Sequence, residues 1–176
     1  TQIMTNPKLR SNLKDITDLY NDITNSSLPA VSIVKPDAFL DGHPASSKWD
    51  LYEGFVKKIV QMVQANPALF AQTAIFITQD EGGGYWDSGY VQPLDFFGDG
   101  TRMPLIVVSP FSKGLGVVHA YGDHVSFDKF VEHNWGLPTI AADTRDNMPN
   151  PITSKANPYA PTNAPAITDF MPFFKF

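Results

Sequence analysis

Two adjacent carboxylates, Asp80 and Glu81, are the residues of this 176-residue chain whose type and spacing most clearly suggest chemistry. They come after the apolar run 74–78 and Gln79, and three glycines follow them at 82–84. Neighbouring negative charges repel each other, and a divalent cation between them removes that cost. Glycines allow a sharp backbone turn and leave room for a ligand. The pattern therefore has two interpretations, a metal site and a solvated turn with two surface acids.

Two histidines lie where they could join such a site. His43 belongs to a Gly-His-Pro loop, and His124 follows Asp123 shortly before Ser126, a residue suited to cap a helix. A histidine beside a carboxylate can bind a metal or transfer a proton. The alternatives are that Asp123 only caps the helix beside a surface histidine, and that His43 is an ordinary loop residue.

Apolar periodicity predicts the elements that would position these residues. Apolar side chains recur about every 3.6 positions in 51–64, which is typical of an amphipathic helix. Continuous apolar runs at 74–78 and 105–109 predict buried strands. The full set is a helix at 13–23, a strand at 31–34, a helix at 51–64, strands at 74–78 and 105–109, and a helix at 126–135 that ends at Gly136. This order predicts an α/β fold with a partly parallel sheet flanked by helices. Ligands of such folds bind beyond the carboxyl ends of the strands, where Asp80 and Glu81 lie.

We expect one domain in three parts. Residues 1–30 form a lead-in helix, residues 31–140 form the α/β core, and residues 141–176 form a tail rich in Pro and Asn that wraps over the domain as ordered coil. Within the core, residues 82–104 form an excursion rich in Gly and aromatic side chains. Arg102, near its end, could clamp an anion or pair with an acid, and we favour the pairing.

Composition excludes several classes of protein. The hydrophobic share of 43% and charged share of 18% are those of a globular chain, not a disordered one. The net charge of -5, without a Lys/Arg cluster, argues against a nucleic-acid partner. No apolar run is long enough to predict a transmembrane segment. The chain has no Cys, so any metal needs oxygen and imidazole ligands, and a periplasmic or secreted bacterial protein fits that composition.

Residues 73–87 resemble the strand and metal loop of the bacterial phosphoesterase family, which includes phospholipases C and related acid phosphatases of the alkaline phosphatase-like superfamily. Further similarities follow the order of the family's motifs, at residues 28–32, 42–44, 102–112 and 122–132. The resemblance covers about residues 15–140. Its motifs are specific when they occur together, though not singly. The chain departs from it at Asp87-Ser88-Gly89, where many members have Asp-His-Val, so the role of the excursion and the substrate preference can differ.

The resemblance implies an alkaline phosphatase-like fold and a metal-dependent phosphoesterase acting on phosphate esters or phospholipids. It implies Asp80 and Glu81 as ligands of a divalent metal ion, and His43 as a side chain that reaches the phosphoryl group or leaving oxygen. It places Asp123 and His124 near the site.

The resemblance also implies that the chain is incomplete. In this family, the nucleophile and the first metal ligands belong to the N-terminal half of the domain, and nothing in residues 1–30 is similar to them. We therefore expect a C-terminal portion whose partner is the missing N-terminal half, with little turnover alone.

Two other functions remain open. A non-catalytic ligand- or carbohydrate-binding module could reuse the fold, since aromatic side chains of the excursion could stack on a sugar. These are Tyr85, Trp86, Tyr90, Phe96 and Phe97. A sulfatase relative is disfavoured, because its usual Asp-His pair is replaced here by Asp80-Glu81.

Overall fold

The computed structural model describes residues 2–87 and 89–176, which fold as two compact units. The first unit comprises the described residues up to Ile75 together with Val108–Pro110, and the second comprises Phe76–Val107 and Phe111–Phe176. None of the helices in this described part combines the length and apolarity needed to cross a bilayer.

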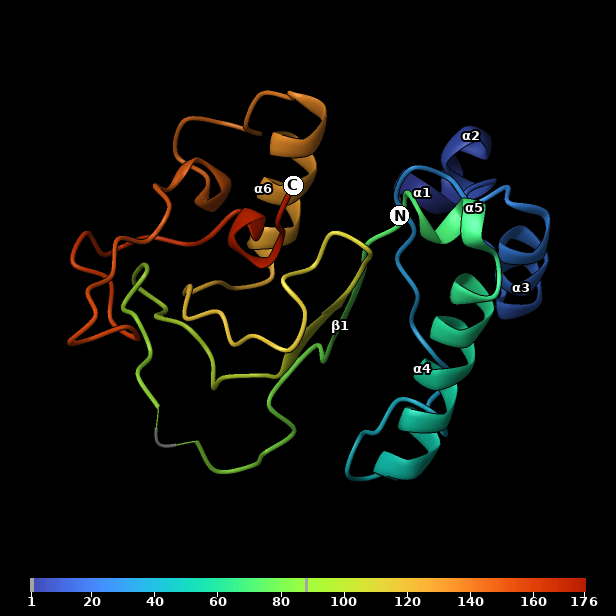
Figure 1. Ribbon diagram of the computed structural model, residues 1–176, viewed down its shortest axis with the longest axis horizontal. Coiled ribbons are helices and arrows are strands. Elements are labelled where there is room, and N and C mark those ends of the chain that lie inside the picture. The colour runs from blue at the N-terminus through green and yellow to red at the C-terminus, as the bar shows by residue number, and fades with distance from the viewer. Residues whose placement is uncertain (1, 88) are drawn as a thin grey trace. The chain divides into compact units, whose positions relative to one another are not determined.

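Helices build the first unit (Figure 1). They are α1 (Gln2–Thr5), α2 (Pro7–Arg10), α3 (Ile16–Asn25), α4 (Trp49–Gln64) and α5 (Pro67–Phe70). Ile23, Val63 and Leu69 form its buried core. The Asn66 side-chain amide donates to the Ser26 hydroxyl at 2.7 Å and so joins the ends of α3 and α4.

The first unit corrects two sequence predictions. The helix expected at 13–23 begins at Ile16, because the Asp15 side chain accepts from the amides of Thr17 and Asp18 and caps it there. Residues 31–34 lie outside any strand, and the Ile33 side chain is 95% exposed. An apolar run becomes a strand only where a neighbouring strand pairs with it.

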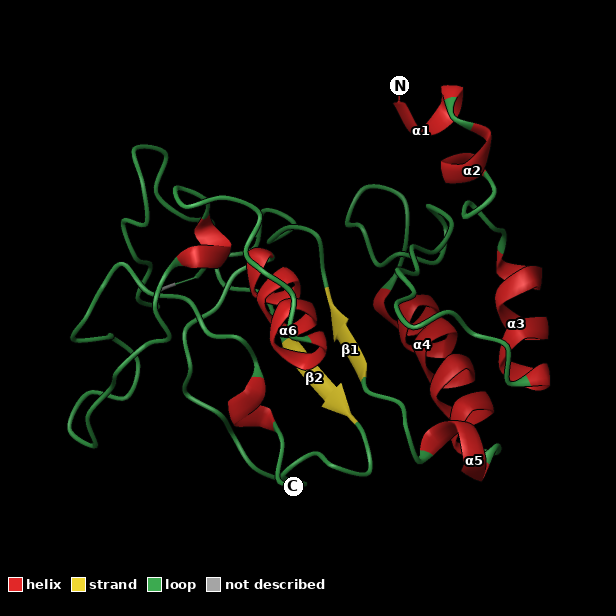
Figure 2. Cartoon of the chain, turned by 90° about the horizontal axis from the view of Figure 1, so that it is seen from above, coloured by secondary structure: helices red, strands yellow, loops and turns green. Residues whose placement is uncertain are grey.

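Two short strands, β1 (Ile75–Thr78) and β2 (Leu105–Val108), form a two-stranded sheet (Figure 2). The Thr78 hydroxyl at the end of β1 donates to the carbonyl oxygen of Pro104, just before β2, at 2.9 Å. The end of one strand therefore meets the start of the other, and the pair is antiparallel. The parallel part of the predicted sheet is not shown by the residues that the structure describes.

The core of the second unit is an aromatic cluster. Phe76 of β1 packs against Phe127 and Phe130 of α6 (Val125–Trp135), with ring centroids 5.6 and 4.9 Å apart. From the tail, Phe170 and Phe174 complete the cluster at 5.7 and 6.0 Å from Phe76. The helix that carries Asp123 and His124 at its start is thus fixed on the strand that leads to Asp80 and Glu81.

Part of the tail, residues 166–170 and Phe174, is buried in this core. Ala166, Ile167 and Thr168 are fully buried, and the Thr168 amide donates to the Tyr121 carbonyl oxygen at 2.8 Å. Two 3₁₀ turns, η1 (Arg145–Asn147) and η2 (Met171–Phe173), interrupt its coil.

Candidate functional site

The turn after β1 has a backbone that demands glycine. Gly83 and Gly84 have φ angles of 62° and 75°, in the left-handed region that favours glycine. A Cβ atom on Gly82 would collide with the Thr101 hydroxyl. Asp80 and Glu81 are exposed at the start of this turn. The sharp turn expected from the sequence is therefore present, with both carboxylates on its rim.

The fit of a metal to this site is partial. Among residues 2–87 and 89–176, no group of three or more His, Cys, Asp or Glu side chains is gathered closely enough to hold an ion. Asp80 and Glu81 offer oxygen ligands that suit a hard divalent cation, but two ligands are fewer than such an ion takes from its surroundings. The described residues do not by themselves form a complete metal site.

His124 lies beside the backbone that leads into this turn. Its Nε2 is 3.1 Å from the carbonyl oxygen of Gln79, the residue before Asp80. A carbonyl oxygen only accepts hydrogen bonds, so Nε2 is the nitrogen that carries the proton. The structure thus brings His124 and the segment that carries Asp80 together, although they lie far apart in the sequence.

Asp123 has structural partners at both carboxylate oxygens. Oδ1 accepts from the Val125 amide at 2.8 Å, which caps the start of α6, and Oδ2 pairs with Arg145 Nη1 at 2.9 Å. The Asp123 side chain is only 8% exposed. Its contacts hold the start of α6 beside His124 in place, and its predicted place near the catalytic site stays a prediction.

His43 belongs to the first unit, in the loop before α4. Its Nδ1 accepts from the Ala45 amide at 3.1 Å, so in the neutral ring Nε2 carries the proton. The Asp41 carboxylate accepts from the His43 amide at 2.8 Å, and Gly42 adopts a φ of 78°. These contacts fix the loop and leave the imidazole on the exposed side of it.

Arg102 has the structural role that we favoured from the sequence. Its Nη2 lies 2.6 Å from Oδ1 of Asp87, and its Nε and its backbone amide donate to the same carboxylate. The hydrogen bonds from Arg102 hold the pKa of Asp87 far below its ordinary value. Ser88, part of the departure from the family pattern, lies outside the described residues.

Arg145, which connects three segments of the second unit, was not predicted from the sequence. Besides Asp123, it contacts Asp95 through Nη2 at 2.6 Å and Nε at 3.1 Å, and the Gly98 carbonyl oxygen through Nη2 at 3.1 Å. A lone arginine in a Pro- and Asn-rich tail has no motif around it, so only the fold reveals it.

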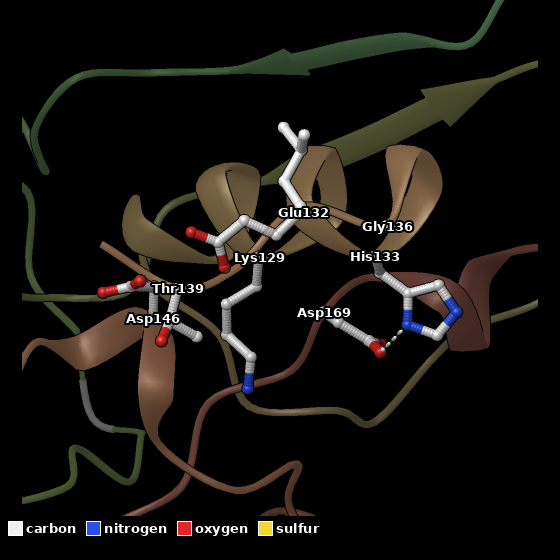
Figure 3. Close-up of a pocket in the computed structure, with 8 residues that line it drawn as sticks. Lys129, Glu132, His133, Gly136, Thr139, Asp146 and Asp169 are labelled. Carbon is white, nitrogen blue, oxygen red and sulfur yellow. Dashed lines mark ion pairs between the residues drawn. The ribbon is translucent and has the colours of Figure 1, made fainter. Parts of the chain in front are cut away.

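A second cluster of ionisable groups lines a cavity of about 430 Å³ between α6 and the tail (Figure 3). It is lined by Lys129, Glu132, His133, Gly136, Leu137, Thr139, Asp146 and Asp169. His133 Nδ1 lies 3.0 Å from Asp169 Oδ2. Asp146 is buried, and its Oδ1 accepts no hydrogen bond from the residues that the structure describes.

The two carboxyl groups of Glu132 and Asp146 lie beside each other in this cavity, as Figure 3 shows. Burial, and then the hydrogen bond with Asp146, raise the pKa of Glu132. Burial alone would raise the pKa of Asp146 as well, but hydrogen bonds from Thr144 and from the Ile140 amide lower it overall. A proton on Glu132 would allow its carboxyl group to donate to the Asp146 carboxylate.

This arrangement leads to a prediction for Glu132→Gln. A folded-state pKa above the unfolded value gives stabilisation that is complete below the unfolded pKa and is lost as the pH rises through the folded pKa. The Glu132 contribution to Tm should therefore be complete below the ordinary Glu pKa of about 4.3 and should fall as the pH rises from there through the raised pKa of the folded state. Gln retains an N–H donor but has no proton to lose, so the variant should lose this part of the pH dependence.

Thermal unfolding of the wild type and Glu132→Gln across that range measures the effect. The matched control is Glu53→Gln, which removes an exposed carboxylate from α4. If the Tm curves of wild type and Glu132→Gln stay parallel, Glu132 and Asp146 do not share a proton.

Comparison with known proteins gives a consistent family. The Phosphoesterase family matches residues 4–138 of the chain. Phospholipase C B of Mycobacterium tuberculosis is 30% identical over 173 residues, which cover 83% of this chain and 33% of the relative. Non-hemolytic phospholipase C of Burkholderia pseudomallei is 31% identical over 143 residues, which cover 65% of this chain and 20% of the relative. Hemolytic phospholipase C of Pseudomonas aeruginosa is 29% identical over 150 residues, which cover 70% of this chain and 20% of the relative. The chain thus spans a third or less of the length of these relatives.

Proposed function

The chain belongs to the phosphoesterase family, and from this premise we propose that the protein hydrolyses phosphate esters, with phospholipid diesters as its substrate class. The observation that carries the proposal is the glycine-dependent turn after β1, which exposes Asp80 and Glu81 and is contacted by His124 at the carbonyl oxygen of Gln79. The three relatives above are named phospholipases C, which supports a phospholipid over other phosphate esters. An alkaline phosphatase-like fold for the whole protein belongs to the same proposal.

Metal dependence is a further part of the proposal. Asp80 and Glu81 would hold a divalent cation with two carboxylate oxygens, and the remaining ligands would come from outside this chain. Such a cation supplies positive charge that stabilises phosphate oxygens and lowers the pKa of a hydroxyl group. The exposure of the pair on a rim shaped by glycines supports this assignment.

We assign proton transfer to His43 and positioning of the turn to His124. The Nε2–H of His43 would donate to the leaving oxygen, and the Nε2–H of His124 would hold the Gln79 carbonyl and so keep the turn in place. The hydroxyl nucleophile would lie outside this chain. The coverage of only a third of the M. tuberculosis relative supports that placement.

A periplasmic or secreted location in a bacterium is proposed with this function. The bacterial origin of the relatives and the absence of Cys support it.

An assay of the longest natural form of the protein tests the proposal. It should release the phosphorylated headgroup from phosphatidylcholine vesicles, lose this activity after treatment with a metal chelator, and regain it when a divalent cation is added back. p-Nitrophenyl phosphate, a monoester, should be hydrolysed more slowly if the diester assignment holds. Activity that the chelator leaves unchanged would refute metal dependence, and an absence of hydrolysis of both substrates would refute the esterase assignment.

A non-catalytic binding module is the second candidate. Trp86, Phe96 and Phe97 are 92%, 95% and 90% exposed on the excursion, where they could stack on a ligand. This alternative is favoured if the same protein binds vesicles or soluble oligosaccharides without hydrolysing either phosphate ester.

A further inference from the structure

We propose that Arg145 is a positioning residue that fixes Asp123 and thereby sets His124 against the Gln79 carbonyl next to Asp80. The catalytic consequence rests on the proposed function, whereas the positioning itself is a property of the second unit alone.

The three guanidinium nitrogens of Arg145 contact three partners, Asp123, Asp95 and Gly98. Nη1 contacts Asp123 at 2.9 Å, Nη2 contacts Asp95 at 2.6 Å and the Gly98 carbonyl oxygen at 3.1 Å, and Nε contacts Asp95 at 3.1 Å. Its side chain is 27% exposed, so these contacts are partly shielded from water. The planar guanidinium group has several N–H donors and can make all of these contacts at once, whereas the compact ammonium group of a lysine cannot.

Asp123 transmits the position of Arg145 to His124. With Oδ1 on the Val125 amide and Oδ2 on Arg145, both oxygens of the buried carboxylate are committed, so the side chain has no freedom to rotate. His124 follows with helical backbone angles of φ -61° and ψ -30° and makes no side-chain cap of its own. Its ring is therefore directed by the backbone that Asp123 anchors, and it reaches the Gln79 carbonyl oxygen.

The Nε and Nη2 nitrogens of Arg145 contact the excursion. Asp95 accepts from the Phe97 amide at 2.8 Å through Oδ1, and Arg145 binds its Oδ2. The Gly98 amide donates to the Asp95 carbonyl oxygen at 3.1 Å and closes the turn. Arg145 thus connects this turn of the excursion to the start of α6.

Loss of Arg145 should leave the fold in place. The Asp123 cap on α6 does not need Arg145, and the excursion has separate anchors. The Tyr121 hydroxyl donates to Asp99 and accepts from the Gln92 amide, both at 2.9 Å, and the Gln92 side-chain amide donates to the Ala166 carbonyl oxygen at 2.9 Å. The expected consequence of removing the guanidinium group is therefore a local displacement of Asp123 and His124.

Arg145→Gln in the longest natural form of the protein tests the inference with two measurements. The first is the ¹⁵N and ¹H NMR signal of the His124 imidazole, which should shift and exchange faster with water once the Nε2–H bond to Gln79 weakens. The second is phosphodiester hydrolysis, in which kcat should fall about 10- to 100-fold, as for other supporting residues, with a smaller change in KM. Added guanidinium ion should restore part of kcat.

The matched control is Arg102→Gln, which removes the other arginine–aspartate pair of the excursion but no contact to Asp123. It should leave the His124 signal unchanged. If Arg145→Gln folds and its His124 signal equals that of the wild type, the inference is overturned, whatever the activity. If the wild type itself hydrolyses no ester, the proposed function fails, and the NMR measurement still decides the role of Arg145. If Arg145→Gln does not fold, the NMR signal of the His124 imidazole is measured in Arg145→Lys. This variant keeps the positive charge but loses the planar guanidinium group, so the His124 signal should still shift.

Discussion

Replacing Asp80 by Asn in the longest natural form of the protein should lower kcat/KM for phosphodiester hydrolysis by at least about a hundredfold. Residues that only support metal ligands already cost about 10- to 100-fold when they are removed, and a direct ligand should cost no less. Asn keeps the size of the side chain and one oxygen but removes the negative charge that would attract a cation. Because Asp80 is exposed on a turn, the substitution should leave the unfolding temperature nearly unchanged.

Steady-state kinetics over a series of divalent-cation concentrations measure this effect. The loss should be partly overcome at high cation concentration, because the change weakens the affinity for the ion. The matched control is Asp128→Asn, which removes an exposed carboxylate from α6 in the same unit. Equal activity and equal cation affinity in Asp80→Asn and Asp128→Asn would show that Asp80 is a surface acid.

Lys129→Met should destabilise the second unit by about 3 kcal/mol. The Lys129 ammonium donates to the carbonyl oxygens of Met148 and Ile167, both at 2.7 Å, and to Asn150 Oδ1 at 3.1 Å, and the residue is only 8% exposed. Met fills a similar volume but removes the donor to the Met148 and Ile167 carbonyl oxygens, whereas Asn150 Oδ1 still accepts from the Asp169 amide. Burial lowers the pKa of Lys129, which fits an ammonium held by the fold at a cost in hydration.

Urea unfolding gives the stability difference, and hydrogen exchange at the Thr168 amide, which donates to Tyr121 in the core, reports it locally. Lys113→Met is the control, because Lys113 belongs to the same unit and its side chain is exposed. That variant should stay within about 0.5 kcal/mol of the wild type. A Lys129→Met protein as stable as the control would refute the structural role of the ammonium.

The helices and strands that were predicted correctly are specified by residues within or next to them. Helix 126–135 was expected to end at Gly136, and α6 does so with that glycine at a φ of 63°. The apolar period of residues 51–64 lies within α4, and the two apolar runs became β1 and β2. Each of these signals needs only neighbouring residues, so no knowledge of the fold was required.

Features that depend on distant partners could not be predicted. The antiparallel pairing of β1 and β2 is decided by the path of the excursion between them, and residues 31–34 carry strand-forming side chains without a described strand to pair with. For the site, the family resemblance supplied the residue types, and the fold added the contact between His124 and Gln79. Arg145 escaped prediction because its partners lie in segments that the sequence does not connect.

The burial of Ala166–Phe174 against β1 and α6 has a consequence for biosynthesis. Phe76 and its partners on α6 emerge from the ribosome well before Phe170 and Phe174, whose rings cover them in the finished unit. During this interval the aromatic side chains of the nascent chain are exposed to water. Their contacts with Phe170 and Phe174 join distant parts of the sequence and therefore form slowly. Newly made protein should therefore keep part of this aromatic cluster exposed until residues 166–174 have been synthesised and have packed against it.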